Sequence, residues 1–160
     1  MNSSRLLVLT ICLQLCGCDY VVREVQNVQC SLPYQLRDVV LRVDRDHLEF
    51  GVTDLVRDLR GATIIPETLR LKDVTGKECR ISLSNGTPVY NGTSPFEPSK
   101  GKVERIRFKL NLERQKNSNH ALSQGDYTLQ LSLLHQGAVY PLVCHFSLVD
   151  RTKPFRVSKI

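Results

Sequence analysis

The chain contains the stretch Leu122-Ser-Gln-Gly-Asp-Tyr-Thr-Leu-Gln-Leu-Ser-Leu-Leu134, in which apolar and polar side chains alternate from Tyr127 onward. Successive side chains of a β-strand point to opposite faces, so this pattern predicts a strand with one buried face. A similar run follows at 140–148, and the residues 135–137 between the two runs can form a hairpin turn. A third run lies upstream at 106–112. Three strands that each have one apolar face need a second layer, so we expect an antiparallel β-sandwich.

The front half of the chain contains shorter alternating segments, at 36–43, 47–52, 67–73 and 78–84. The valine-rich segment 19–29 is consistent with either a first strand or an arm. Thr53–Gly61 is the one helix candidate, of one or two turns, although a loop or a strand suits it nearly as well. Pro141 cannot donate a ladder hydrogen bond, so we expect the strand that contains it to lie at a sheet edge, at least locally.

Length and composition indicate one folded domain, because 160 residues with 24% charged and 41% hydrophobic residues are typical of a globular protein. Residues 1–18 resemble a cleaved signal peptide, with Arg5 before an apolar core, 6–15, that is too short to span a bilayer. We therefore expect a sandwich domain at 19–150 and a basic C-terminal tail at 151–160. The protein is expected to be secreted or to reside in the cell envelope (periplasm, outer membrane or cell surface).

The cleavage site has two interpretations. Leu15-Cys-Gly-Cys18 resembles a bacterial lipobox, in which Cys18 becomes lipidated and anchors the protein to a membrane. Ordinary signal cleavage at the small residues Gly17 or Cys18 is the alternative.

The cysteines that follow the leader are Cys30, Cys79 and Cys144, with Cys18 as a fourth if it stays unmodified. Export favours disulfides over metal ligation, and four cysteines allow three pairings. We favour a Cys30–Cys79 bond and expect Cys144 to be buried.

Signs of catalysis are weak. Asp44, Asp46 and Glu49 surround His47 and suggest a calcium loop, but the further ligands, the central glycine and the terminal glutamate of an EF-hand do not follow in register, so a solvated turn is the better interpretation. Cys144 and His145 are neighbours in sequence and should point to opposite faces of a strand, which rules them out as a catalytic dyad. We predict a protein that is not an enzyme and that needs no cofactor and no metal.

The best candidate for a contact surface is the row Arg105, Arg107 and Lys109, which alternates with apolar residues. Such a row suits an acidic protein partner or an anionic surface, although a merely solvated face has the same pattern. Few aromatic residues accompany it, so we do not expect nucleic-acid binding. Asn85 and Asn91 each begin an Asn-Gly-Thr triplet in a predicted loop, and they are glycosylation candidates if the source is eukaryotic or viral.

The last third of the chain resembles the closing segment of fimbrial (pilin-type) subunits. The resemblance rests on Phe108–Leu112, a polar loop, the Leu-x-x-Gly-x-Tyr turn at 122–127 and the strand that follows. It implies an immunoglobulin-like sandwich that serves adhesion or assembly at a bacterial surface. The chain departs from the pattern because Ala138–Val149 supplies a further strand, which favours a self-complete accessory module over a polymerising one.

Two alternatives belong to other functional classes. Gly125-x-Tyr127 with a later strand and Cys144 is also similar to the end of secreted lipid-recognition domains that carry sterols or glycolipids. The second alternative, an outer-membrane lipoprotein that aids assembly, depends on Cys18.

Overall fold

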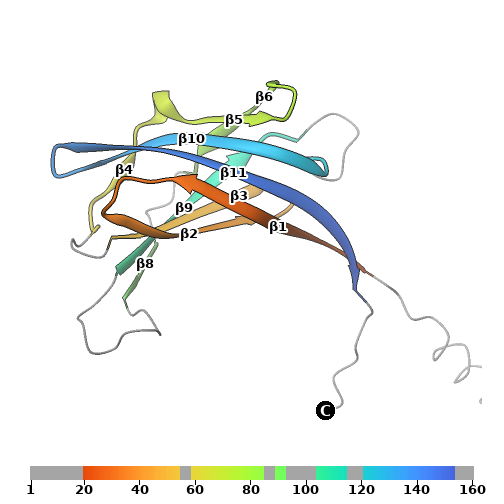
Figure 1. Cartoon of the computed structure of the whole chain (residues 1–160), viewed down its shortest axis with the longest axis horizontal. Helices are drawn as coiled ribbons and strands as arrows, with labels where there is room; N and C mark the ends of the chain where they lie inside the picture. The colour runs from red at the N-terminus through yellow and green to blue at the C-terminus, as the bar shows by residue number, and fades with distance from the viewer. Residues whose placement is uncertain (1–19, 55–58, 85–88, 93–103, 115–120, 154–160) are drawn as a thin grey trace, which may run out of the picture.

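The computed structural model describes residues 20–54, 59–84, 89–92, 104–114 and 121–153, and it shows two antiparallel sheets packed face to face (Figure 1). Sheet A has the strand order β1-β11-β10-β5-β6, and β4 also pairs with β10. Sheet B has the order β2-β3-β9-β7, and β8 also pairs with β9. The expected all-β sandwich is therefore confirmed. The strands are β1 (Tyr20–Ser31), β2 (Leu36–Val43), β3 (His47–Asp54), β4 (Thr63–Ile64), β5 (Arg70–Asp73), β6 (Glu78–Cys79), β7 (Ile81–Leu83), β8 (Val89–Gly92), β9 (Glu104–Leu112), β10 (Gly125–His135) and β11 (Ala138–Lys153), with one 3-10 turn at Pro66–Thr68.

The hairpin of β10 and β11 forms as the alternation predicts. Gln136 and Gly137 both have positive φ, 49° and 78°, which lets the two-residue turn follow the twist of the strands. The apolar series of β10 is buried against sheet B, while its alternate residues face outward. In sheet B the matching inner residues come from β3 and β9, where the rings of Phe50 and Phe108 stack with centroids 6.3 Å apart. Burial of these two faces against each other forms the core.

The helix predicted at Thr53–Gly61 is wrong for its first residues. Thr53 and Asp54 continue β3, where they lie opposite Arg37 and Leu36 of β2 and are buried. A short segment with weak helix signals gains more from pairing within a sheet than from one or two isolated turns. Residues 55–58 lie outside the described part of the chain.

The predicted boundary between domain and tail at residue 150 falls inside a strand. β11 continues to Lys153 because its last residues pair with the start of β1, Lys153 opposite Tyr20. Arg151 also forms an ion pair with Glu24 on β1, at 3.4 Å. The segment 19–29 therefore belongs mainly to a strand, and the described end of the tail is part of the sheet.

Pro141 lies on an interior strand but at a locally open edge. β11 is flanked by β10 and β1, yet β1 ends at Ser31, opposite Val143. The residue opposite Pro141 on β10 is Ser132, whose N–H and carbonyl bond to Thr68 and Ile65 on the far side. The backbone nitrogen of Pro141 therefore points away from β10, toward the side that β1 does not reach. Its missing N–H removes no hydrogen bond between strands.

The predicted Cys30–Cys79 disulfide is wrong, because Cys30 bonds to Cys144 and Cys79 is free. Cys30 and Cys144 lie directly opposite each other on β1 and β11, with Cα atoms 4.1 Å apart. Cys79 lies in the same row across sheet A, but Leu71 and Leu129 separate it from Cys144. Four strand spacings place Cys79 roughly 19 Å from Cys30, far beyond the reach of a disulfide. Cys144 is buried, as predicted.

Several predictions concern residues outside the described part of the chain. These are the signal peptide with Cys18, most of the tail and Asn85. Asn91 lies in β8, not in the loop that its sequence predicts, and is opposite Arg105 of β9. Among the described residues, no helix has the length and apolar character needed to cross a membrane.

Candidate functional site

Strand β9 places Arg105, Arg107 and Lys109 on the outer face of sheet B, as the alternation predicts. The residues between them, Ile106 and Phe108, are buried in the core. The three cations follow one another along the strand at intervals of roughly 7 Å.

Strand β2 adds two further cations, Arg37 and Arg42, to the same face. Their positions differ by five residues, so a regular strand would point them to opposite faces. The register of β2 against β3 shifts between Arg37 and Val40, and Asp38 within this bulge has a φ of 50°. The bulge brings Arg37 and Arg42 to one side. Sequence reasoning missed both arginines because no local signal marks the bulge.

We call these five residues, Arg37, Arg42, Arg105, Arg107 and Lys109, the basic face. The register places Arg37 and Arg105 on either side of Thr53, and Arg42 and Lys109 on either side of Glu49. Two strand spacings separate β2 from β9, so the outer cations enclose an area of about 10 by 14 Å.

Charge on the basic face is only partly compensated. Arg107 Nη1 lies 3.3 Å from Glu49 Oε1, and Arg105 Nε donates to Thr53 Oγ1 at 3.4 Å. Arg37, Arg42 and Lys109 are exposed, and none of them has an ion-pair partner among the described residues.

Gly51 explains how Arg105 and Arg107 fit on the sheet. A Cβ atom at Gly51 would lie 3.3 Å from Cγ of Arg107 and 3.7 Å from Cδ of Arg105. The aliphatic parts of both arginines therefore extend across β3, where a larger residue would crowd them. Both side chains are half-buried, whereas the sequence suggests a freely solvated row.

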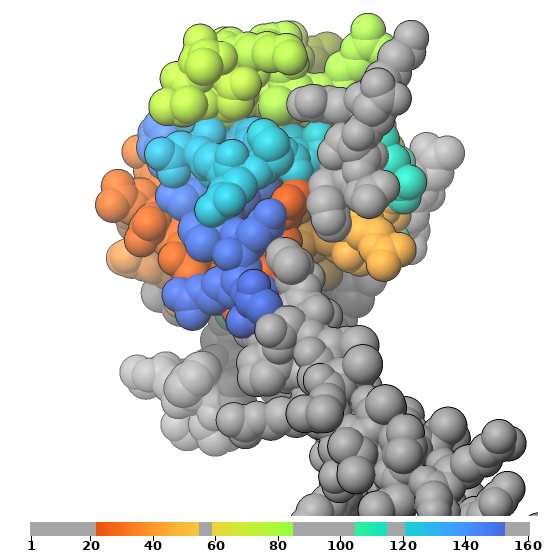
Figure 2. Space-filling model, turned by 90° about the vertical axis from the view of Figure 1, so that its right-hand side faces the viewer, coloured from red at the N-terminus to blue at the C-terminus, as the bar shows by residue number. Residues whose placement is uncertain are grey.

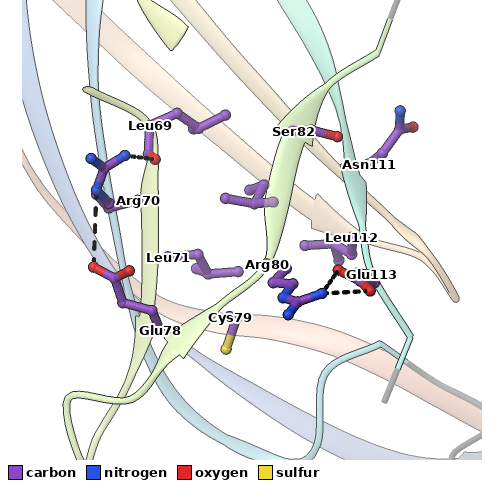
Figure 3. Close-up of a pocket in the computed structure, with 11 residues that line it drawn as sticks. Leu69, Arg70, Leu71, Glu78, Cys79, Arg80, Ser82, Asn111, Leu112 and Glu113 are labelled. Carbon is purple, nitrogen blue, oxygen red and sulfur yellow. Dashed lines mark hydrogen bonds and ion pairs between the residues drawn. The ribbon is translucent and has the colours of Figure 1, made fainter. Parts of the chain in front are cut away.

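A second feature is a pocket of about 560 Å³ at the open side of the sandwich, where β5 and β6 of sheet A lie beside β7 and β9 of sheet B (Figure 3). Leu71 and Leu112 give it an apolar floor, and the ion pair of Arg80 with Glu113 flanks it. Cys79 lies in its wall. Partial burial raises the pKa of the Cys79 thiol, so the neutral, less nucleophilic form predominates at pH 7.

The acidic turn between β2 and β3 is held together by protein groups. Asp46 lies 2.6 Å from His47 Nδ1 and 3.3 Å from Arg114, and Asp44 accepts the N–H of Arg45. Within the described part of the chain, no group of three or more His, Cys, Asp and Glu side chains is placed to hold a metal ion. Cys144 and His145 do point to opposite faces, one buried and one exposed.

Comparison of the chain with protein-family models, curated proteins and solved structures found no match.

Proposed function

We propose that the protein is a non-enzymatic, exported module that binds at a cell surface or within the envelope, and that the basic face makes the contact. The observation that carries this proposal is the gathering of five cations on β2 and β9, of which Arg107 alone has an ion-pair partner, Glu49, among the described residues. A flat array of this kind attracts an anionic surface or an acidic protein partner and steers its approach. Adhesion or assembly of the fimbrial type is the role that the resemblance of the last third implies.

We further propose that the sandwich is immunoglobulin-like. The order β2-β3-β9-β7 is consistent with the A-B-E-D sheet of that fold, and β11-β10-β5 is consistent with its G-F-C sheet. The hydroxyl of Tyr127, at the start of β10, donates to the Ser123 carbonyl at 2.9 Å, as in the tyrosine corner of such domains. β1 is then an additional strand that occupies the edge of β11 within the same chain, which supports a self-complete module.

The pocket between the sheets favours a second candidate function, recognition of a lipid. Its volume of about 560 Å³ and its apolar floor suit an acyl chain or a similar apolar group. Mass spectrometry of the protein as exported tests this alternative and the role of Cys18 together. A co-purified lipid in the native spectrum supports a carrier, whereas a diacylglyceryl group on Cys18 supports a membrane-anchored lipoprotein.

Neutralising two cations of the basic face should weaken binding to anionic vesicles. The variant Arg37→Gln with Lys109→Gln removes two exposed cations, each worth about 1 kcal/mol near an anionic membrane, without placing a carboxylate opposite Glu49. We expect affinity for phosphatidylglycerol vesicles to fall by at least roughly 30-fold in about 30 mM salt, where the Debye length is roughly 18 Å. Co-sedimentation measures this change.

The matched control is Lys77→Gln with Arg151→Gln, which alters net charge equally at exposed positions outside both the basic face and the pocket. Equal binding by the two variants, or strong binding to phosphatidylcholine vesicles, would contradict the proposed contact. Arg107 stays unchanged in both variants, because its replacement would remove the ion-pair partner of Glu49 and confound binding with stability.

Replacing Tyr127 by phenylalanine should lower the free energy of unfolding by about 1–2 kcal/mol, because it removes the donor to a partly buried carbonyl. Urea denaturation measures the change. Tyr34→Phe is the control, since Tyr34 is 79% exposed and should show no effect. A loss at Tyr127 no larger than at Tyr34 would count against a tyrosine corner.

A further inference from the structure

A groove of about 540 Å³ crosses the outer face of sheet A, on the opposite side of the sandwich from the basic face. One rim is the bulge of β1 near Asn27, and the other is the β5–β6 turn at 74–76. Figure 2 shows the β5–β6 hairpin in yellow-green above the start of β10 in cyan, with β11 in blue below. We call this site the polar groove.

The floor of the polar groove consists of polar side chains in register across the sheet. Gln29, His145, Thr128 and Lys72 form one row over β1, β11, β10 and β5. His145 Nδ1 and Thr128 Oγ1 are hydrogen-bonded at 2.9 Å. This contact holds the orientation of the imidazole ring, and Nε2, the other ring nitrogen, points away from Thr128. His145 is exposed, so Nε2 is available for a ligand.

A second hydrogen-bonded set lies beside this row. Ser147 donates to Asp126 Oδ1 at 2.6 Å, and the Asn27 amide donates to Ser147 Oγ at 3.4 Å. Asp126 is exposed, and its second oxygen has no partner among the described residues. The floor thus presents oriented donors and acceptors in close proximity.

The bulge of β1 brings the Asn27 amide to this set. The register of β1 shifts between Gln26 and Gln29, and Asn27 has a φ of 53°, in the left-handed region. A non-glycine residue there costs of order 1 kcal/mol, and bulges often re-aim a side chain beside a functional site. On the opposite rim, Val74 is 76% exposed.

The arrangement excludes two ligand classes. An extended peptide cannot add a strand at the floor, because β10 pairs with β11 and β5, and β11 pairs with β1. A polyanion has little to bind, because Lys72 is offset by Asp73 and Asp126 in the lining. A hydroxyl-rich neutral ligand fits better, since each hydroxyl both donates and accepts and the lining offers a carboxylate, amides, hydroxyls and an imidazole.

We propose that the polar groove binds a neutral carbohydrate, one or two sugar units of a glycan. The volume lies in the range of small-molecule sites, and the exposed Val74 in the lining can contact the apolar C–H face of a sugar. The site is independent of the basic face, so its test can succeed or fail separately from the proposed function.

The test uses the full mature chain on a glycan array printed with neutral, sialylated and sulfated oligosaccharides. We expect binding to a subset of neutral glycans. We expect at least a tenfold loss of affinity, by titration with the best of these glycans, in both Asp126→Asn and His145→Ala. Glu67→Gln, an exposed change outside the groove, and Arg37→Gln with Lys109→Gln, on the basic face, should leave this binding unchanged.

Three results would overturn the proposal. One is the absence of any neutral glycan among the ligands. A second is retention of full affinity by both groove variants with unaltered melting temperatures. The third is binding restricted to sulfated or sialylated glycans and abolished by the basic-face variant, which would support the proposed function instead.

Discussion

Replacing Cys30 and Cys144 together by alanine is expected to lower the free energy of unfolding by about 5 kcal/mol. The disulfide joins residues 114 positions apart, so it closes a loop that includes nearly all the described strands. On the chain-entropy model, a loop of this length restricts the unfolded chain by an amount worth about 5 kcal/mol. Because domains are typically stable by only about 5–15 kcal/mol, the variant should be marginally folded at 37 °C.

Urea denaturation of the oxidised protein and of the double variant measures this loss. Cys79→Ala is the matched control, since Cys79 is free and only half-buried, and it should cost no more than about 1 kcal/mol. Equal destabilisation by the two changes would show that Cys30 and Cys144 do not cross-link the folded protein. Peptide mapping without reductant gives an independent readout and should recover the two cysteines in one linked fragment.

Replacing Phe50 by alanine is expected to cost about 3–5 kcal/mol. Phe50 is fully buried in the inner face of β3, and its ring stacks on that of Phe108 across the β3–β9 pair. Truncation removes the transfer free energy of the ring and leaves a cavity between the two sheets, which packed strands cannot fill by collapsing. The expected result is unfolding at a lower urea concentration, while the slope of the free energy of unfolding against urea concentration stays unchanged.

Val139→Ala provides the comparison for Phe50→Ala. Val139 is 55% exposed near the β10–β11 turn, so its truncation should change the free energy of unfolding by less than about 0.5 kcal/mol. A loss at Phe50 similar to that at Val139 would mean that the two sheets do not pack through β3.

Some parts of this fold follow from local sequence alone. Side chains of a strand alternate because of covalent geometry, so the apolar series of β10 predicts both the strand and its buried face. The turn at Gln136 and Gly137 is equally local, because glycine tolerates a left-handed conformation that the hairpin requires. The same period places Arg105, Arg107 and Lys109 on one outer face. The sequence by itself therefore determined the fold class, the hairpin and three of the five residues of the basic face.

Only the tertiary structure decided which strands are neighbours. Periodicity says which face of a strand is buried but nothing about strand order, so it could not distinguish Cys144 from Cys79 as the partner of Cys30. Periodicity also cannot predict the bulges of β1 and β2. An extra residue in a strand reverses which of the following side chains face outward, and no fixed sequence signal marks it. Those two bulges place Asn27 in the polar groove and bring Arg37 to the basic face. Both surfaces depend on contacts between residues distant in the chain, and such contacts are set by the packing of whole sheets rather than by local preference.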